Sequence, residues 1–207
     1  MNNPHPKFKK ISLFLGVILL LVGMERAFAA QDPIEMLSSV TGSVMEELKK
    51  YRPSVQQQPN KLYSMVDRLI VPYVDFVEMA RWVVGRNAWN KADETTQKEF
   101  VKEFRRLVVR SYARTLLEYK DQVVKFLPLR SPIESQQRIQ ISSYIIDNVG
   151  TRVHIEYRLL LEEDKWRVYD IIVEGVSLVQ GYRAQFAEDI RDGGVAEIVA
   201  KMRQHNI

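Results

Sequence analysis

The chain has 207 residues, of which 46% are hydrophobic, and it carries a formal net charge of +4 at pH 7. This length suits one domain, or one domain with a small lobe. The chain has no cysteine, so its fold does not depend on disulfides and must be held by its core alone.

Residues 1–29 have the features of a secretory signal peptide. Three lysines within residues 7–10 form a basic segment, and residues 11–22 form a run of 12 apolar, serine and glycine residues. The small residues of Ala27-Phe28-Ala29 resemble a cleavage site. The run is shorter than the roughly 20 apolar residues of a membrane-spanning helix, which argues against an uncleaved anchor. We expect cleavage after Ala29 and a periplasmic domain.

Loss of this segment changes the charge of the protein. Residues 1–29 hold four basic side chains and one acidic side chain, so the remaining 178 residues carry only +1. Nucleic-acid binding would first require a basic face of the whole domain. The sequence therefore gives no support to nucleic acid as a partner.

Residues 32–120 show the period of amphipathic helices. Asp32, Pro33 and Glu35 favour the start of a first helix, and Pro53 is expected to end it before a polar loop over residues 56–60.

Further helices follow within this region. A second helix is expected to end before Pro72, and a short third helix to run from about Asp75 to Gly85. Asp93 is expected to cap a long helix whose apolar stripe continues to Tyr119, about six turns.

After Asp121 the period changes from that of a helix to that of a strand. Residues 122–127, 138–141, 153–161 and 165–173 read as strands separated by turns. A closing helix pair is expected to be split at Gly193-Gly194. Helices first, a meander of about four antiparallel strands second and helices last predict an α+β fold, with helices packed on one face of a curved sheet.

The segment from Lys165 to Phe186 links the sheet to the closing helices. It begins as a strand that is apolar on both faces, breaks at Gly175 and continues as a helix for which Ser177 is a suitable N-cap. A strand that is apolar on both faces must be covered on both faces.

Residues with catalytic or metal-binding chemistry are scarce. The three histidines, His5, His154 and His205, do not form a metal cluster or a Ser/His/Asp set. Asp170 and Glu174 lie in an otherwise apolar strand, on the face of Trp166 if the pleat is regular. Such a carboxylate in an apolar cup could act as a general base. With no partner acid or base in the sequence nearby, we favour a structural role at a bulge or helix start.

A basic stripe follows the predicted long helix. It could meet anionic lipid headgroups or an acidic partner, or it could be a solvated face paired with Glu99 and Glu103. Its members are Lys98, Lys102, Arg105, Arg106, Arg110 and Arg114. The many aromatic residues likewise fit either a filled core or a cavity between the sheet and the long helix.

Three segments carry a resemblance to a known family. They are LIVPYVDFVEMARWVVGRNAW (69–89), ADETTQKEFVKEFRRLVVRSYARTLLEY (92–119) and KWRVYDIIVEGVSLVQGYRAQF (165–186). In this order they resemble the MlaC family, also called the toluene-tolerance Ttg2D family. The resemblance implies an NTF2-like curved sheet with surrounding helices that enclose an apolar cavity.

The resemblance also implies a function. Family members are soluble periplasmic phospholipid carriers that exchange lipid between the outer-membrane protein MlaA with its porin and the MlaD-type MCE protein of an inner-membrane ABC transporter. Phospholipid would be cargo, with its acyl chains in the pocket and its headgroup outside. Neither a metal nor a cofactor nor an enzymatic activity is expected, and the protein is expected to be a monomer.

Motif position and apolar facing give an expected pocket lining. Its residues are Leu69, Tyr73, Phe76, Phe104, Leu107, Val108, Tyr112, Ile141, Tyr157, Ile172 and Val176. Arg106 and Arg110 are expected to dock the carrier on its transporter partner. Two alternatives stay open: an NTF2-like enzyme of the isomerase or dehydratase type with Asp170 or Glu174 as base, and an adaptor protein with a filled core.

Overall fold

The computed structural model describes residues 31–205 apart from 58, 120, 130–131 and 134–135. The expected signal peptide, residues 1–29, lies outside the described residues. Among the helices that are described, none combines the length and the apolar character needed to cross a membrane.

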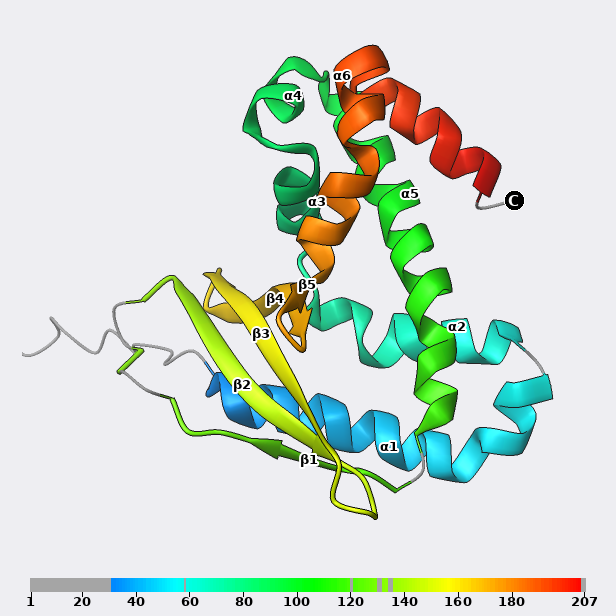
Figure 1. Ribbon diagram of the computed structural model, residues 1–207, viewed down its shortest axis with the longest axis vertical. Helices are drawn as coiled ribbons and strands as arrows, with labels where there is room; N and C mark the ends of the chain where they lie inside the picture. Colours follow the sequence, from blue (N-terminus) through cyan, green and yellow to red (C-terminus); the bar gives the residue numbers. More distant parts are fainter. Residues whose placement is uncertain (1–30, 58, 120, 130–131, 134–135, 206–207) are drawn as a thin grey trace, which may run out of the picture.

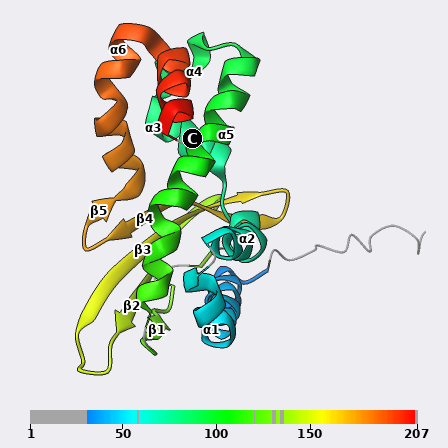
Figure 2. The same ribbon diagram turned by 90° about the vertical axis from the view of Figure 1, so that its right-hand side faces the viewer.

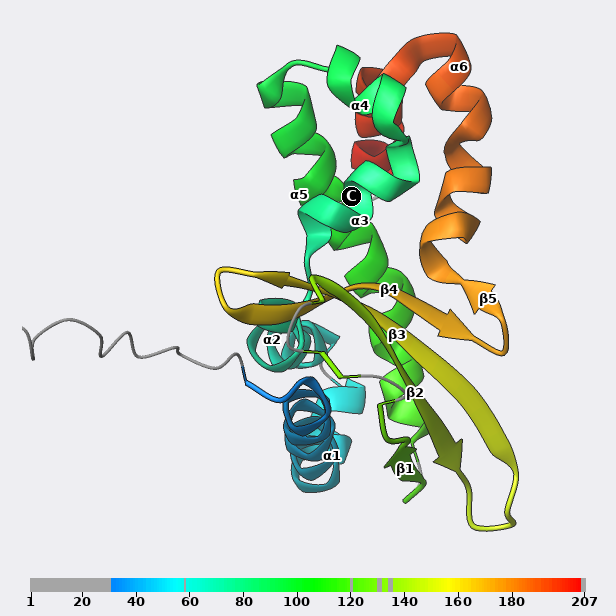
Figure 3. The same cartoon turned by 90° about the vertical axis from the view of Figure 1, so that its left-hand side faces the viewer.

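The chain forms helices first, then the sheet, then a closing helix (Figure 1). The helices are α1 (Pro33–Gln57), α2 (Pro59–Leu69), α3 (Phe76–Val84), α4 (Arg86–Lys91), α5 (Glu94–Tyr112) and α6 (Leu178–His205), with short 3-10 helices η2 (Val71–Tyr73) and η3 (Ala113–Glu118). The strands are β1 (Val123–Phe126), β2 (Arg138–Ile146), β3 (Arg152–Glu162), β4 (Lys165–Val173) and β5 (Val176–Ser177). Turned views show that α5 extends from the upper helices past the sheet toward α1 (Figures 2 and 3).

Side-chain caps set the helix starts that the sequence predicted. The carboxylate of Asp75 accepts a hydrogen bond from the Glu78 N–H at 2.8 Å, and that of Asp93 accepts one from the Thr96 N–H at 2.9 Å. α3 ends at Gly85, whose φ of +81° suits a residue without a side chain. The expected split of the closing helix is confirmed, since Gly194 interrupts α6 with a φ of +71°.

Three helical expectations were wrong or incomplete. α1 continues through Pro53 to Gln57, because a proline removes only one N–H bond and the rest of a long helix can offset that loss. The short helix α4 was not predicted. The helix that begins after Asp93 is α-helical only to Tyr112 and then tightens into η3, a change that an apolar stripe does not encode.

The sheet is an antiparallel meander in the order β1-β2-β3-β4-β5. The α+β class with a curved sheet is confirmed, with five strands instead of about four. Glu163 and Asp164 form the turn between β3 and β4, and both have positive φ, at 48° and 60°. A two-residue hairpin turn with this backbone twist matches the twist of its strands. The unpredicted strand is β5, which has only two residues.

A bulge in β4 changes which side chains share a face. Leu159 lies opposite Val168, but its neighbour Arg158 lies opposite Asp170, so Tyr169 is an extra residue in β4. Val168 therefore faces α1, on what we call the inner face, whereas Asp170 faces the other way. The expectation that Asp170 shares a face with Trp166 fails for this reason. Both faces of β4 are covered, as its apolar sequence required.

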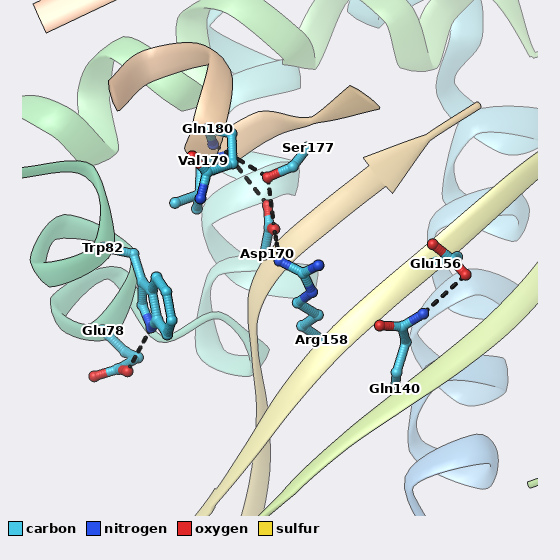
Figure 4. A network of polar contacts seen from close by, with 9 residues as sticks. All are labelled: Glu78, Trp82, Gln140, Glu156, Arg158, Asp170, Ser177, Val179 and Gln180. Atoms are coloured by element: carbon cyan, nitrogen blue, oxygen red, sulfur yellow. Dashed lines mark hydrogen bonds and ion pairs between the residues drawn. The ribbon is translucent and has the colours of Figure 1, made fainter. Parts of the chain in front are cut away.

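The buried carboxylate of Asp170 joins β4 to α6 (Figure 4). It is 1% exposed and accepts hydrogen bonds from the Ser177 hydroxyl at 2.7 Å, the Val179 N–H at 3.1 Å and the Arg158 guanidinium at 3.2 Å. Ser177 Oγ in turn accepts from the Gln180 N–H at 3.1 Å, which confirms it as a cap of α6. The structural interpretation of Asp170 is the one the geometry supports.

Asp170→Ala should lower the free energy of unfolding by about 3 kcal/mol, because it leaves the Arg158 guanidinium, the Ser177 hydroxyl and the buried Val179 N–H without their acceptor. Ser177→Ala should cost about 1 kcal/mol, the usual loss of an N-cap. Urea denaturation measures both. The control is Asp192→Ala, which removes an exposed partner of Arg191 and should change stability by less than about 0.5 kcal/mol. If Asp170→Ala and Asp192→Ala lower the free energy of unfolding equally, Asp170 does not join β4 to α6 in the way described.

Candidate functional site

The apolar interior is divided into three clusters. The upper cluster lies among α3, α4, α5 and α6 and includes Phe100 and Phe104, both 0% exposed. The sheet cluster lies between α1 and the inner face and includes Ile141 and Leu159. The lower cluster lies among α1, α2 and η3 and includes Leu48.

Each pair of clusters is joined by at least one shared element. α5 contributes Phe104 to the upper cluster and Val109 to the margin of the lower cluster. α1 contributes Leu37 to the sheet cluster and Leu48 to the lower cluster. β4 contributes Val168 to the sheet cluster, while its bulged Tyr169 packs in the upper cluster. The three clusters are therefore distinct in packing but joined by continuous backbone.

The expected pocket residues are distributed over all three clusters. Phe76 and Phe104 are buried in the upper cluster, Ile141 is buried in the sheet cluster, and Ile172 is buried at 5% exposure. The half-buried residues lie at cluster margins: Leu107 and Val108 at the upper, Tyr157 at the sheet and Leu69 at the lower cluster. The most exposed are Tyr73 at 38%, Tyr112 at 46% and Val176 at 71%.

Hydroxyl groups lie among these apolar walls. Ser143 on the inner face is 0% exposed, and its hydroxyl donates to the Tyr157 oxygen over a long 3.5 Å. Burial raises the pKa of Tyr157, and the Ser143 contact partly opposes this effect. Burial also raises the pKa of Tyr182 on α6, where the Ser111 side chain of α5 partly opposes it. Ser143 was not predicted, and only its place in an alternating strand could have indicated it.

A cavity of about 290 Å³ lies beside β2, where the chain leaves β1. Its walls combine apolar side chains with amides, a hydroxyl and a carboxylate. They are Leu127, Pro128, Leu129, Ile133, Gln136, Ile139, Gln140, Ile141, Ser142 and Glu156. Gln140 donates to Glu156 at 2.8 Å across two strands (Figure 4). The volume is at the lower limit for small-molecule pockets, so this cavity alone would hold only a small group or one end of a chain.

The carboxylates considered as general bases have structural partners. Asp170 is occupied by the donors of the β4–α6 joint, and the exposed Glu174 accepts a hydrogen bond from the backbone N–H of His154. Within the described part of the chain, no group of three His, Cys, Asp or Glu side chains is placed to hold a metal ion. The arrangement offers walls for an apolar ligand, and the contacts of Asp170 and Glu174 serve to hold strands and helix together.

The basic stripe of α5 is partly used in ion pairs. Arg105 bonds to Asp67 of α2 at 2.6 Å, Lys98 pairs with Glu94 at 2.6 Å, and Arg106 lies 3.5 Å from the buried Glu103. These contacts resemble the solvated, paired face that was the alternative to docking. Arg106 and Arg110 are nevertheless exposed and lie one turn apart.

Comparison with known proteins gives consistent matches. The chain is 24% identical over 180 residues to the toluene tolerance protein ttg2D of Pseudomonas putida, which covers 86% of this chain and 83% of that protein. It is 22% identical over 200 residues to the intermembrane phospholipid transport system binding protein MlaC of Haemophilus influenzae, with 95% and 92% covered.

A solved structure gives the same result. The phospholipid-binding protein from Ralstonia solanacearum, determined in complex with a phospholipid, superposes with a TM-score of 0.75 and 28% identity over 83% of this chain and 95% of that chain. The family model described as MlaC protein matches residues 38–204. The chain thus belongs to the MlaC family.

Proposed function

We propose that this protein is a periplasmic phospholipid carrier that moves lipid between an outer-membrane MlaA–porin complex and an MlaD-type MCE protein of an inner-membrane ABC transporter. The observation that carries the proposal is the match in fold and sequence to a relative solved with a phospholipid bound. The apolar walls described above are in accord with that cargo.

We assign the acyl chains to the half-buried margins of these clusters. Leu107, Val108 and Tyr157 lie at the margins of their clusters and are half-buried, so they have apolar surface left to cover. The cavity beside β2, at about 290 Å³, is too small for a diacyl lipid, since pockets for larger ligands reach roughly 1,000 Å³. Loading therefore requires the cluster margins to move apart, with the β2 cavity as one end of the enlarged pocket.

The energetics suit a carrier. About 30 methylenes at roughly 0.8 kcal/mol each correspond to about 24 kcal/mol of transfer out of water. A bilayer offers the same chains a similar environment, so the pocket needs only to match the membrane. Tighter binding would prevent delivery. An apolar pocket with few polar groups and a headgroup left in water meets this requirement.

Protein isolated from the periplasm of a Gram-negative host should be a monomer with copurified phospholipid. Mass spectrometry after native extraction identifies the lipid, and size-exclusion chromatography with light scattering gives the mass. Asp170→Asn should keep the lipid, because the carboxylate holds the joint and not the cargo. Lipid-free protein that takes up no lipid from vesicles would contradict the carrier proposal.

Val108→Trp should displace lipid from the proposed pocket. Because Val108 lies at a cluster margin, the lipid-free variant should lose little melting temperature, whereas overpacking a filled core costs about 1–3 kcal/mol. The matched control is Val83→Trp, at a position that is 0% exposed in the upper cluster, which should be strongly destabilised. If Val108→Trp destabilises the lipid-free protein as much as the control, this face of α5 is ordinary core.

Reversal of both Arg106 and Arg110 to Glu should slow association with the MCE protein by roughly tenfold at low salt, because grouped charges steer encounter. Copurified lipid should be unchanged, since an exposed ion pair is worth at most about 1 kcal/mol. Stopped-flow association over a salt series measures the effect. The double reversal of the exposed Arg152 and Arg191 controls for net charge. Loss of lipid, or an association rate like that of wild type, would refute docking by this pair.

A further inference from the structure

The exposed side of α3 and the short η2 helix before it carry three large apolar side chains. Tyr73 is 38% exposed, Val77 42% and Trp82 40%, and Arg81 is exposed beside them. Within α3, Val77 and Arg81 are four residues apart and lie on one line along the helix, and Trp82 lies about 140° around the helix from Val77, on the other side of Arg81. Tyr73 belongs to η2, the turn that precedes α3. We call Tyr73, Val77, Arg81 and Trp82 the α3 patch. Large apolar side chains gathered on a surface mark a contact site more often than isolated ones do.

The exposed indole of Trp82 is held rigidly. Its Nε1–H donates to the buried carboxylate of Glu78 at 2.8 Å (Figure 4). Its ring stacks on that of Tyr169, with the ring centroids 6.2 Å apart. Arg138 donates to the same carboxylate at 2.8 Å and lies 5.0 Å from the centre of the Tyr169 ring. Because the polar atom of the indole is satisfied inside the protein, the part that faces outward is hydrocarbon. Because the indole is already fixed, contact with an apolar partner can bury its outer edge at little cost in side-chain entropy.

Guanidinium groups surround this edge. Arg81 and Arg138 both lie beside the single carboxylate of Glu78, and their side chains are 56% and 45% exposed. Arg167 joins them, because the sheet register places Arg138, Leu160 and Arg167 in one row across β2, β3 and β4. The hydrogen bond from the Asp75 N–H to the Val168 carbonyl brings this end of β4 against the start of α3. Three cations against the carboxylates of Glu78 and of Asp75, the N-cap of α3, leave the surroundings of the patch with a net positive charge.

We infer that the α3 patch is a membrane-contact surface that seats at the boundary between the anionic headgroups and the acyl chains of a bilayer. Tyrosine and tryptophan rings are favoured at this depth, and arginine side chains extend from it toward phosphate. The positive surroundings of the patch complement anionic headgroups and strengthen the contact. This inference goes beyond the carrier function, because a carrier that exchanges lipid only with proteins needs no such surface.

The natural tryptophans provide the reporter for a test. Trp89 and Trp166 are buried at 7% and 5% exposure, whereas Trp82 is 40% exposed, so a change in emission on contact with a surface reports Trp82. Protein already loaded with phospholipid is mixed with vesicles of phosphatidylethanolamine and phosphatidylglycerol, or of phosphatidylcholine alone. Emission is followed in parallel with vesicle flotation. We expect a shift to shorter wavelength and flotation with the anionic vesicles, both weakened by salt.

Two variants leave the reporter intact. Val77→Asp places a charge in the patch at an exposed position of the first turn of α3, where an acidic residue is tolerated by the helix, and should lower vesicle binding at least about tenfold. Arg81→Gln should lower binding to anionic vesicles about fivefold. The control Arg152→Gln removes an exposed cation at the other end of β3 and should leave binding unchanged.

The outcomes separate this inference from the carrier function. Wild-type protein that keeps its lipid but neither floats with anionic vesicles nor shifts its emission overturns the membrane contact alone. Val77→Asp that binds vesicles like wild type also overturns it. So does an emission shift produced by a purified acidic partner protein and not by vesicles, which would make the patch a protein-docking surface. Loss of copurified lipid in wild type would instead count against the carrier function.

Discussion

The buried carboxylate of Asp170 holds together the strands and the helix that meet at the end of β4. A charge taken out of water is tolerated only when donors replace the lost solvent, and here the donors come from β3, β5 and the first turn of α6. The bulge at Tyr169 is what turns Asp170 toward these donors and sends the tyrosine ring to the helices. The junction of β3, β4, β5 and the first turn of α6 therefore depends on one carboxylate and its three donors.

Much of this arrangement was readable from the sequence, because caps and strand alternation act locally. Asp75, Asp93 and Ser177 identify helix starts through the chemistry of a side-chain acceptor near free N–H groups, and Gly194 marks a backbone turn that other residues avoid. The bulge in β4 could not be predicted from the sequence, because an extra residue in one strand is defined only by its pairing with the neighbouring strand. The face assigned to Asp170 was wrong for that reason. The passage of α1 through Pro53 likewise depends on the rest of the helix and not on the proline itself.

The candidate site was less predictable than the fold. Periodicity indicates which side of α5 faces inward, but it does not distinguish the buried Phe104 from the half-buried Val108 one turn later. That difference arises because the first half of α5 packs between α3 and α6, while its second half passes on toward the lower cluster. Loop residues such as Leu129 and Ile133, which line the cavity beside β2, lie outside any periodic segment and gave no signal in the sequence.

The way in which the three clusters share elements has a mechanical consequence. α5, α1 and β4 each pack in two of the clusters, and on β4 the two packed residues, Val168 and Tyr169, are adjacent. A rearrangement of side chains in one cluster therefore moves backbone that a second cluster also holds, so the three clusters do not repack independently. A change in the filling of one margin should then spread through these elements to the outer surface, where a binding partner would meet a difference in shape.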